Sequence, residues 1–376
     1  MARRILTGVT VLDVTQIVAG PYATRMLADL GADVIRIEPP AVLAGEQRGR
    51  GGLNLGKRSI VLDLKKAEGI EIALKLAADA DVLVENYRPG ALTRLGLGHD
   101  AVHAQNPRLV YATISGFGTD TSFGERPAYG ATAHAEAGWL WVQQQAQGGA
   151  EPFAPGVTVA DLVTGMNACM AVLAALFDRV TTGAGQFVNV TLMDSQLAFL
   201  GEVAGPLLAG EPFRPFRHGL QKTQDGYLTV NAGPPRSWQR LAGAVGDPGA
   251  AADGAEAVSK AVTGWAEGRS TATAATTLGE AGVAYGVMHT LDEALAHPYF
   301  AERGMVRELP LENPGGPRVV ASPLRFSNAE TGPWCRAPEP GEHTRAILEQ
   351  FGFETDRIDA LVHTGVVHQS ASSEAQ

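Results

Sequence analysis

Asp161 is the residue whose type and surroundings point most clearly to chemistry. It follows a short, mostly apolar run, 155–160, and precedes a long segment, 162–177, that carries no charged residue. A carboxylate is costly to bury, so its place at the start of an apolar helix needs a reason. One reason is helix capping, because aspartate suits the positive end of the helix dipole. The other is catalysis, because a carboxylate in a closed cleft can serve as a nucleophile.

The composition describes a soluble globular chain. Its 376 residues are 45% hydrophobic and 19% charged, which is enough for two domains with sizeable cores. The two cysteines form no disulfide framework, and the sequence shows no phosphate-loop motif and no Cys/His spacing typical of a metal site. We find no signal peptide and no segment hydrophobic enough to cross a bilayer, so we expect a cytoplasmic protein without a membrane partner.

The charge pattern narrows the range of partners. The net charge of −10 argues against nucleic acid. Residues 1–100 carry 13 Lys and Arg against 12 Asp and Glu, whereas the remaining residues carry 17 against 28. A phosphorylated small molecule would therefore bind most favourably within the first hundred residues.

Hydrophobic runs alternate with helical patterns along the first half of the chain. We expect strands at 9–14, 33–38, 59–64, 81–86, 109–114 and 186–191. Helices are expected at 22–30, 66–78 and 162–177, so the fold class is α/β with a Rossmann-like parallel sheet. The glycine fingerprint of dinucleotide-binding proteins is absent after the first strand. Glu38 ends the second strand, where a ribose-binding acid would lie, and without those glycines we expect it to be solvated.

The second half of the chain predicts a further, smaller domain. We expect a large domain at 1–204, a proline-containing linker at 205–222 and a small α+β domain at 223–325. A helix is expected at about 193–204, just before the linker. The tail, 326–376, contains two expected helices, 343–351 and 354–362, and should return to pack on the large domain.

Several motifs, in order along nearly the whole chain, resemble those of the family III coenzyme A (CoA) transferases. They are VLDVT (11–15), AGP (19–21), LGADVIRIE (30–38), NLGKRS (54–59), LDLK (62–65), VENYRPG (84–90), SGFG (115–118), GQFVNV (185–190), DGY (225–227) and GEHT (341–344). This family, also called CaiB/BaiF, includes formyl-CoA and carnitine CoA-transferases and the related α-methylacyl-CoA racemases. The resemblance implies an α/β domain and a small domain, in two chains interlocked as rings in a homodimer.

The resemblance places Asp161 at the family's catalytic aspartate. There the carboxylate attacks an acyl-CoA, giving a mixed anhydride and then an enzyme–CoA thioester, from which a carboxylic acid takes the CoA. CoA and acyl-CoA are thus implied as substrates, with no permanently bound cofactor. The activity implied is that of a CoA-transferase, the EC 2.8.3 type.

The resemblance also implies where CoA is bound. Lys65, Asn86, Tyr87 and Arg94 fall where the family holds the adenine and the phosphates, and their types suit those groups. The further candidates are Arg36, Lys57, Leu62 and Tyr129. Read from the residues alone, Lys65 and Arg94 would be exposed helix charges and Tyr87 a packing residue.

The chain departs from the family pattern around residue 130. Racemases carry Gly-His-Asp where this chain has Ala128, Tyr129 and Gly130. His134 lies four residues beyond Gly130, on the same helix face, so it is either an acid–base group or a structural histidine. The missing His–Asp pair favours CoA transfer. The alternatives are a racemase or isomerase, an intramolecular CoA transferase, or a non-catalytic CoA-binding subunit of a heteromer.

Overall fold

The chain forms two compact units. The computed structural model describes residues 3–45, 51–149, 151–214, 219–230, 235–309 and 316–370. The first unit comprises Met1–Gln144, Ala150–Pro212 and Gly304–Gln376, and the second comprises Gln145–Gly149 and Phe213–Arg303. Parts of the expected linker (215–218), small domain (231–234 and 310–315) and tail (371–376) lie outside the described residues.

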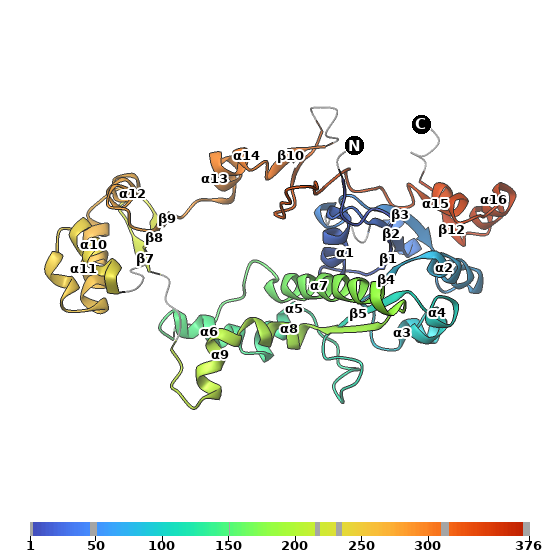
Figure 1. Ribbon diagram of the computed structural model, residues 1–376, viewed down its shortest axis with the longest axis horizontal. Coiled ribbons are helices and arrows are strands. Elements are labelled where there is room, and N and C mark those ends of the chain that lie inside the picture. The colour runs from blue at the N-terminus through green and yellow to red at the C-terminus, as the bar shows by residue number, and fades with distance from the viewer. Residues whose placement is uncertain are drawn as a thin grey trace. The chain divides into compact units, whose positions relative to one another are not determined.

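Among the described residues, seven strands form the sheet of the first unit, in the order β12-β3-β2-β1-β4-β5-β6 (Figure 1). The strands are β1 (Thr10–Val14), β2 (Asp33–Glu38), β3 (Arg58–Leu62), β4 (Val82–Glu85), β5 (Val110–Ser115), β6 (Phe187–Thr191) and β12 (Val367–His368). Strands β1 to β6 are parallel, and β12 pairs antiparallel with β3. The predicted α/β class and parallel sheet are confirmed.

Both faces of this sheet are apolar because helices cover each of them. Val11 packs in one cluster of buried side chains and its neighbour Leu12 in the other. The Val11 face is covered by α1 (Ala19–Asp29) and α7 (Val159–Thr182). The Leu12 face is covered by α2 (Ala67–Asp79) and by two helices of the tail, α15 (Thr344–Gln350) and α16 (Thr355–His363).

The other elements of the first unit are short. They are α3 (Ala91–Leu95), α4 (His99–Gln105), α5 (Gly130–Glu136), α8 (Leu192–Phe199), α9 (Gly201–Leu208), and the strand pair β10 (Val306–Glu308) and β11 (Arg318–Val320). α6 (Trp139–Ala146) extends into the stretch assigned to the second unit. Two helices replace the single one expected at 193–204, and α9 continues through Pro206 into the expected linker. Residues 304–309 and 316–325, which the sequence pattern assigned to the small domain, belong to the first unit.

The second unit packs helices against a small antiparallel sheet. Its strands are β7 (Leu220–Lys222), β8 (Tyr227–Val230) and β9 (Tyr285–Val287). Its helices are α10 (Pro235–Ala244), α11 (Ala255–Glu267), α12 (Thr271–Glu280), α13 (Leu291–Ala296) and α14 (Pro298–Glu302). Leu228, Val262, Trp265 and Leu278 form the centre of its hydrophobic core.

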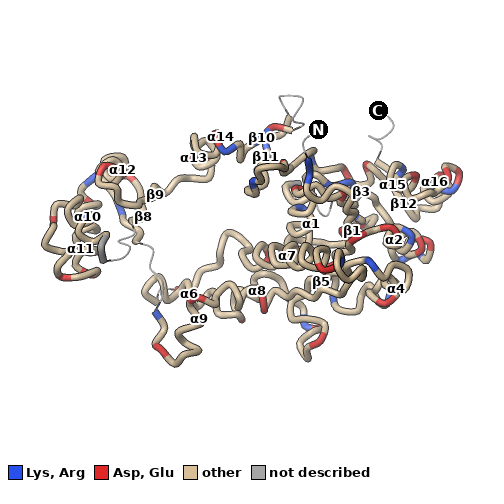
Figure 2. The backbone as a smooth tube through the Cα atoms, in the orientation of Figure 1, with Lys and Arg blue, Asp and Glu red and all other residues tan. Residues whose placement is uncertain are grey.

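Helix α7 is unusually apolar for its length, and Figure 2 shows no charged residue along most of it. Among the described residues it is the one helix that meets the length and hydropathy of a membrane span, with a mean hydropathy of 1.7, which the sequence pattern did not predict. Half of that span is buried inside the protein. Buried core helices share this composition, and α7 packs on α1 and the sheet. We therefore interpret it as a core helix.

Candidate active site

A cavity of about 260 Å³ opens at the carboxyl ends of the central strands. Its walls come from residues 16–19 after β1, 86–89 after β4, 114–116 at the end of β5, and Asp161 of α7. The strand order reverses between β1 and β4. Ligands of open α/β sheets bind at such a reversal, outside the carboxyl ends of the strands. The cavity therefore lies where this fold class places its ligand sites.

Asp161 lies in the first turn of α7, lines this cavity and is 8% exposed. A close approach of α7 to α1 sets the position of this turn. A Cβ atom built on Gly165 would lie 2.6 Å from the carbonyl oxygen of Ala19, so only glycine permits this packing. The carboxylate is thus carried by a helix that is fixed against its neighbour.

Gly130, the first residue of α5, lies directly against the Asp161 carboxylate. A Cβ atom at Gly130 would lie 2.1 Å from Asp161 Oδ2, so the carboxylate could not keep its present position. The carboxylate therefore occupies the space that a side chain would take in any other residue. In this chain, a side chain at residue 130 would require the Asp161 carboxylate to move.

His134 lies behind the nucleophile candidate and does not line the cavity. It is 2% exposed, and its Nε2 accepts a hydrogen bond of 3.0 Å from the backbone N–H of Ala160. Its ring stacks on Trp139 at 4.8 Å. Burial lowers the pKa of His134, so the neutral ring that this bond requires is favoured. This contact suits a positioning role, in which His134 holds the first turn of α7.

Two substitutions separate these roles of His134. Glutamine can still accept the Ala160 N–H, so His134→Gln should keep most of the kcat. Phenylalanine keeps a ring beside Trp139 but leaves the N–H unpaired, so His134→Phe should lose about 1–3 kcal/mol of unfolding free energy and part of the kcat. Chemical denaturation and steady-state kinetics on both variants measure this. An inactive, well-folded His134→Gln would instead show that His134 moves a proton.

The same histidine should make stability depend on pH. Because the pKa of His134 is lower in the folded chain, the unfolded chain binds more protons as the pH falls below about 6.5. The unfolding free energy should thus be at its full value above that pH and decrease below it. His343, whose pKa burial also lowers, contributes in the same direction. Denaturation of His134→Gln should show a smaller decrease than the wild type.

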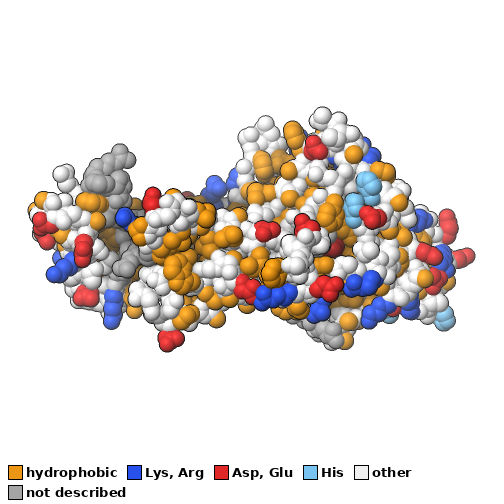
Figure 3. Space-filling view, turned by 90° about the horizontal axis from the view of Figure 1, so that it is seen from below, with side chains coloured by type: hydrophobic (Ala, Val, Ile, Leu, Met, Phe, Trp, Pro, Cys, Tyr) orange, Lys and Arg blue, Asp and Glu red, His pale blue; other side chains and the backbone are white. Residues whose placement is uncertain are grey.

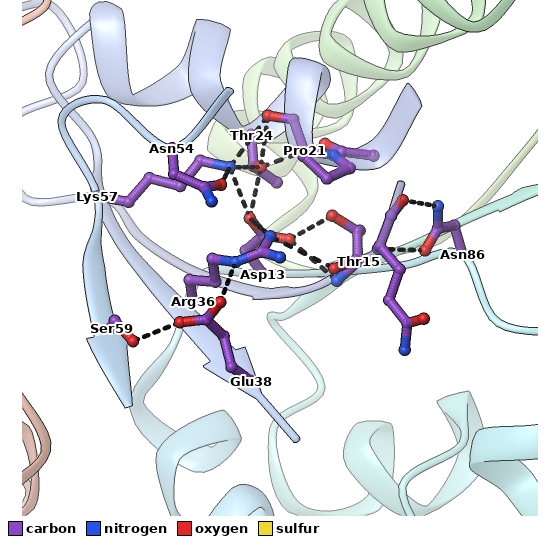
Figure 4. Close-up of polar contacts among 12 residues, drawn as sticks. Asp13, Thr15, Pro21, Thr24, Arg36, Glu38, Asn54, Lys57, Ser59 and Asn86 are labelled. Carbon is purple, nitrogen blue, oxygen red and sulfur yellow. Dashed lines mark hydrogen bonds and ion pairs between the residues drawn. The ribbon is translucent and has the colours of Figure 1, made fainter. Parts of the chain in front are cut away.

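Beneath the cavity, Lys57 and Arg36 belong to a buried network of charges (Figure 4). The Lys57 ammonium donates to Asp13 Oδ2 at 2.8 Å and to Thr24 Oγ1 at 2.9 Å. Arg36 pairs with Glu38 at 3.0 Å and lies 3.6 Å from Asp13. Burial raises the pKa of Asp13, but Lys57 and Arg36 outweigh it and hold that pKa below the usual range.

This network holds secondary structure together. The Asp13 and Lys57 side chains are fully buried, and both Lys57 and Arg36 are absent from the residues lining the cavity. Glu38 is also buried, where it accepts a 2.6 Å hydrogen bond from Ser59 Oγ, so the expectation of a solvated strand end was wrong. The network joins β1, β2, β3 and the start of α1 below the site.

Asn86 shapes the cavity wall. Its side chain accepts from the Gln16 N–H and donates to the Gln16 carbonyl, both at 2.7 Å, which ties the loop after β4 to the loop after β1 (Figure 4). Next to Gln16, Ile17 adopts a φ of 69°, a costly conformation for a β-branched residue. Such strain is concentrated at functional sites, which agrees with the position of this loop on the cavity.

A second cavity, of about 250 Å³, is lined by Leu62, Lys65 and Tyr87. All three are CoA-binding candidates that the family resemblance implied. Pro39, Pro40 and Leu95 form most of its apolar wall. Tyr87 lines this cavity and also the first one. The two cavities are therefore neighbours that share the Tyr87 side chain as part of their walls.

The remaining candidates are distributed around the two cavities. Tyr129 lines the first cavity, whereas Arg94 is exposed on α3 and lines neither. The sequence reasoning missed two cations of the first cavity, Arg88 and Arg126. Arg126 pairs with Glu136 and lies 5.0 Å over the Phe117 ring. Arg88 stands inside the VENYRPG motif, directly after a strand at the sheet's reversal, and that place could have singled it out.

With this geometry established, the chain can be assigned to a class. The family model of CoA-transferase family III matches residues 6–344, and the protein belongs to that family. It is an enzyme of the CoA-transferase class, which uses CoA thioesters as substrates.

Individual relatives are similar over nearly their whole length. An acyl-CoA transferase of Fusarium pseudograminearum is 31% identical, over 96% of this chain and 88% of its own. Succinyl-CoA:glutarate CoA-transferase of Mus musculus is 30% identical, over 97% and 90%. The crystal structure of Rv3272 from Mycobacterium tuberculosis superposes with a TM-score of 0.82 at 28% identity, covering 92% of this chain and 99% of that one.

Proposed function

We propose that the protein moves CoA from an acyl-CoA to a carboxylic acid, with Asp161 as the covalent nucleophile. One observation carries this proposal: a nearly buried carboxylate, packed against Gly130, lines a cavity at the reversal of the sheet. An aspartate that only stabilises the helix dipole needs no more than a place in the first turn, as Asp194 has in α8. A helix-dipole role does not explain the cavity in front of Asp161.

The proposed reaction splits one difficult exchange into easier steps. An Asp161 oxygen attacks the thioester carbonyl, the C–S bond breaks, and a mixed anhydride and the CoA thiolate form. The thiolate attacks the aspartyl carbonyl, which releases the donor acid and leaves an Asp161–CoA thioester. The acceptor carboxylate then runs the same two steps in reverse and regenerates the Asp161 carboxylate. The first backbone N–H groups of α7 favour the developing negative charge.

The two cavities suit an extended CoA thioester. The apolar second cavity fits the adenine against Leu62 and Tyr87, with the exposed Lys65 at its edge for a phosphate. Tyr87, which lines both cavities, marks the path of the pantetheine chain to Asp161. We propose that Lys65 and Arg94 bind the phosphates, that Asn86 and Tyr129 shape the thioester end, and that Arg36 and Lys57 act only through the buried network.

Removing Lys65 or Arg94 should therefore raise the KM for acyl-CoA with little change in kcat, because these contacts serve ground and transition states alike. Each loss should be about tenfold, the usual effect of one charge-assisted hydrogen bond. Lys66 is the matched control, because its ammonium donates to the carbonyls of Thr364 and Gly365. Steady-state kinetics of Lys65→Ala, Arg94→Ala and Lys66→Ala test this prediction. If the KM for acyl-CoA is unchanged in both Lys65→Ala and Arg94→Ala, CoA binds elsewhere.

The structure favours transfer over racemisation. A racemase needs an acid and a base on opposite sides of the α-carbon. Here Gly130 has no side chain, and the Nε2 of the buried His134 already accepts the Ala160 N–H. A non-catalytic subunit that only binds CoA would not need the Asp161 carboxylate in the cavity. Retention of configuration at the α-carbon of a chiral 2-methylacyl-CoA, followed by NMR in deuterated water, tests the distinction.

We propose a dicarboxylic acid as the acceptor. The succinyl-CoA:glutarate relative carries such substrates in its name. The exposed Arg88 lies on the Asp161 cavity, where it can hold the remote carboxylate of such an acid. Mass spectrometry of reactions with succinyl-CoA should show transfer to glutarate and much less to butyrate. Equal transfer of CoA to glutarate and butyrate would show that Arg88 does not select for a second carboxylate.

A homodimer of interlocked rings is part of this proposal. The chain leaves the first unit, forms the second and returns to the first. Each chain must follow such a path if it is to form a ring that interlocks with its partner. Four apolar side chains of α7 are exposed, those of Met166, Met170, Phe177 and Val180. Figure 3 shows many hydrophobic side chains on the face that it views. Light scattering should give twice the chain mass, and tagged and untagged dimers should not exchange chains before denaturation. A monomer, or rapid exchange, would contradict the proposal.

A further inference from the structure

A third cavity, of about 400 Å³, lies beside α3 and α4 on the face of the sheet opposite α7. It shares no lining residue with the two cavities described above. Tyr111 and Thr113 of β5, Phe187 of β6 and Glu85 of β4 form its floor, and His99 and Asp100 of α4 its rim. The reaction proposed for Asp161 makes no use of these groups.

Glu85 is the buried acid among the residues that line this cavity. Its side chain is nine-tenths buried, and one carboxyl oxygen accepts a 2.7 Å hydrogen bond from the Tyr87 N–H. Burial raises the pKa of Glu85 to about 7, which the Tyr87 bond only partly offsets. The residues that line the cavity include no lysine and no arginine. An acid that burial disfavours as an anion thus faces an open space without a positive partner.

Three aromatic rings line the same cavity as this acid. The Tyr111 and Phe187 rings are stacked with centroids 6.1 Å apart, and His99 lies 5.7 Å from the first and 5.2 Å from the second. The Tyr111 hydroxyl donates to the Leu97 carbonyl at 3.0 Å, so that ring is fixed. Hydroxyl groups complete the lining, from Thr93, Thr113 and Thr119.

We propose that this cavity binds a small organic ammonium ion, with Glu85 as its counter-ion and the rings of Tyr111, Phe187 and His99 as its walls. A cation near a buried carboxyl favours the ionised acid, and aromatic faces attract cations that have lost part of their water. The hydroxyl groups suit an ammonium ion that carries a hydroxyl of its own. The proposal stands independently of the reaction at Asp161.

The affinity of this cavity for an ammonium ion should change with pH in one direction. The groups that face the cavity are Glu85 from β4, Tyr111 from β5, and His99 and Asp100 from α4, with His103 stacked behind His99. A cation binds the ionised form of Glu85, so affinity should increase as the pH rises through about 7.

Calorimetry on the full-length protein with matched probes tests the inference. The probes are choline, ethanolamine, and the uncharged isostere of choline in which a tert-butyl group replaces the trimethylammonium. At least one amine should bind about tenfold more tightly than the isostere, as an aromatic site with a carboxylate would give. Affinity should decrease severalfold from pH 8 to pH 6, values that bracket the pKa of about 7.

The variants are chosen to keep the fold. Glu85→Gln retains an acceptor for the Tyr87 N–H, and Phe187→Ala changes a side chain that is 41% exposed. Each should weaken amine binding about tenfold, whereas Asp161→Asn should leave it unchanged. Equal binding of choline and its isostere, no saturable binding of either amine, or full affinity in both cavity variants would overturn the proposal.

Discussion

Asp161→Asn should lose at least about a thousandfold in kcat, as expected when a covalent nucleophile is removed. Asparagine has the same shape but cannot open a thioester by carboxylate attack. The variant should keep its circular dichroism spectrum, because the amide fits the space against Gly130 that the carboxylate occupies. Steady-state assays with succinyl-CoA and glutarate measure the loss.

Asp194→Asn is the matched control for this variant. Asp194 occupies the first turn of α8 as Asp161 occupies that of α7, but it is exposed and lines no part of the first cavity. Its replacement should cost about 0.3–1 kcal/mol of helix-dipole stabilisation and leave kcat unchanged. If Asp161→Asn also lost only this stability and kept its activity, Asp161 would do no more than stabilise the helix dipole of α7, whose N-cap is Thr158.

Gly130→Ala should lower kcat about a hundredfold although every polar group of the site remains. The added methyl group would lie 2.1 Å from Asp161 Oδ2, so the carboxylate must rotate or α5 must shift. A displacement of about 1 Å at the reacting atom is enough for such a loss. Overpacking should also reduce the unfolding free energy by about 1–3 kcal/mol.

The control for this substitution is Gly156→Ala, in the loop before α7. A Cβ atom at Gly156 meets no other atom within 4 Å. Its kcat and thermal midpoint should equal those of the wild type. A fully active Gly130→Ala would mean that the Asp161 carboxylate does not react from the position seen here.

The sheet was predictable because its strands are buried on both faces. Such strands read as continuous apolar runs, and 33–38 matches β2 (Asp33–Glu38) residue for residue. Strand β12 was not predicted, because two residues pairing antiparallel with β3 carry no pattern of their own. The break between α8 and α9 was also missed, because Gly201 is the one helix-terminating signal at their junction.

The site was predictable in part. An aspartate next to a charge-free helix is visible in the sequence, and so are cations within a motif. Burial and pairing are not visible: Lys57 and Glu38 are polar in the sequence, yet both are buried by partners that come from other strands. The contact of Gly130 with Asp161 joins residues far apart in the chain, so only the fold reveals it.

Trapping the covalent intermediate tests the central claim most directly. The protein would be incubated with acyl-CoA, treated with hydroxylamine, digested and analysed by tandem mass spectrometry. The account predicts a hydroxamate on Asp161, dependent on acyl-CoA and absent from Asp161→Asn. A protein that transfers CoA at full rate while Asp161 stays unmodified and another residue carries the hydroxamate would contradict it.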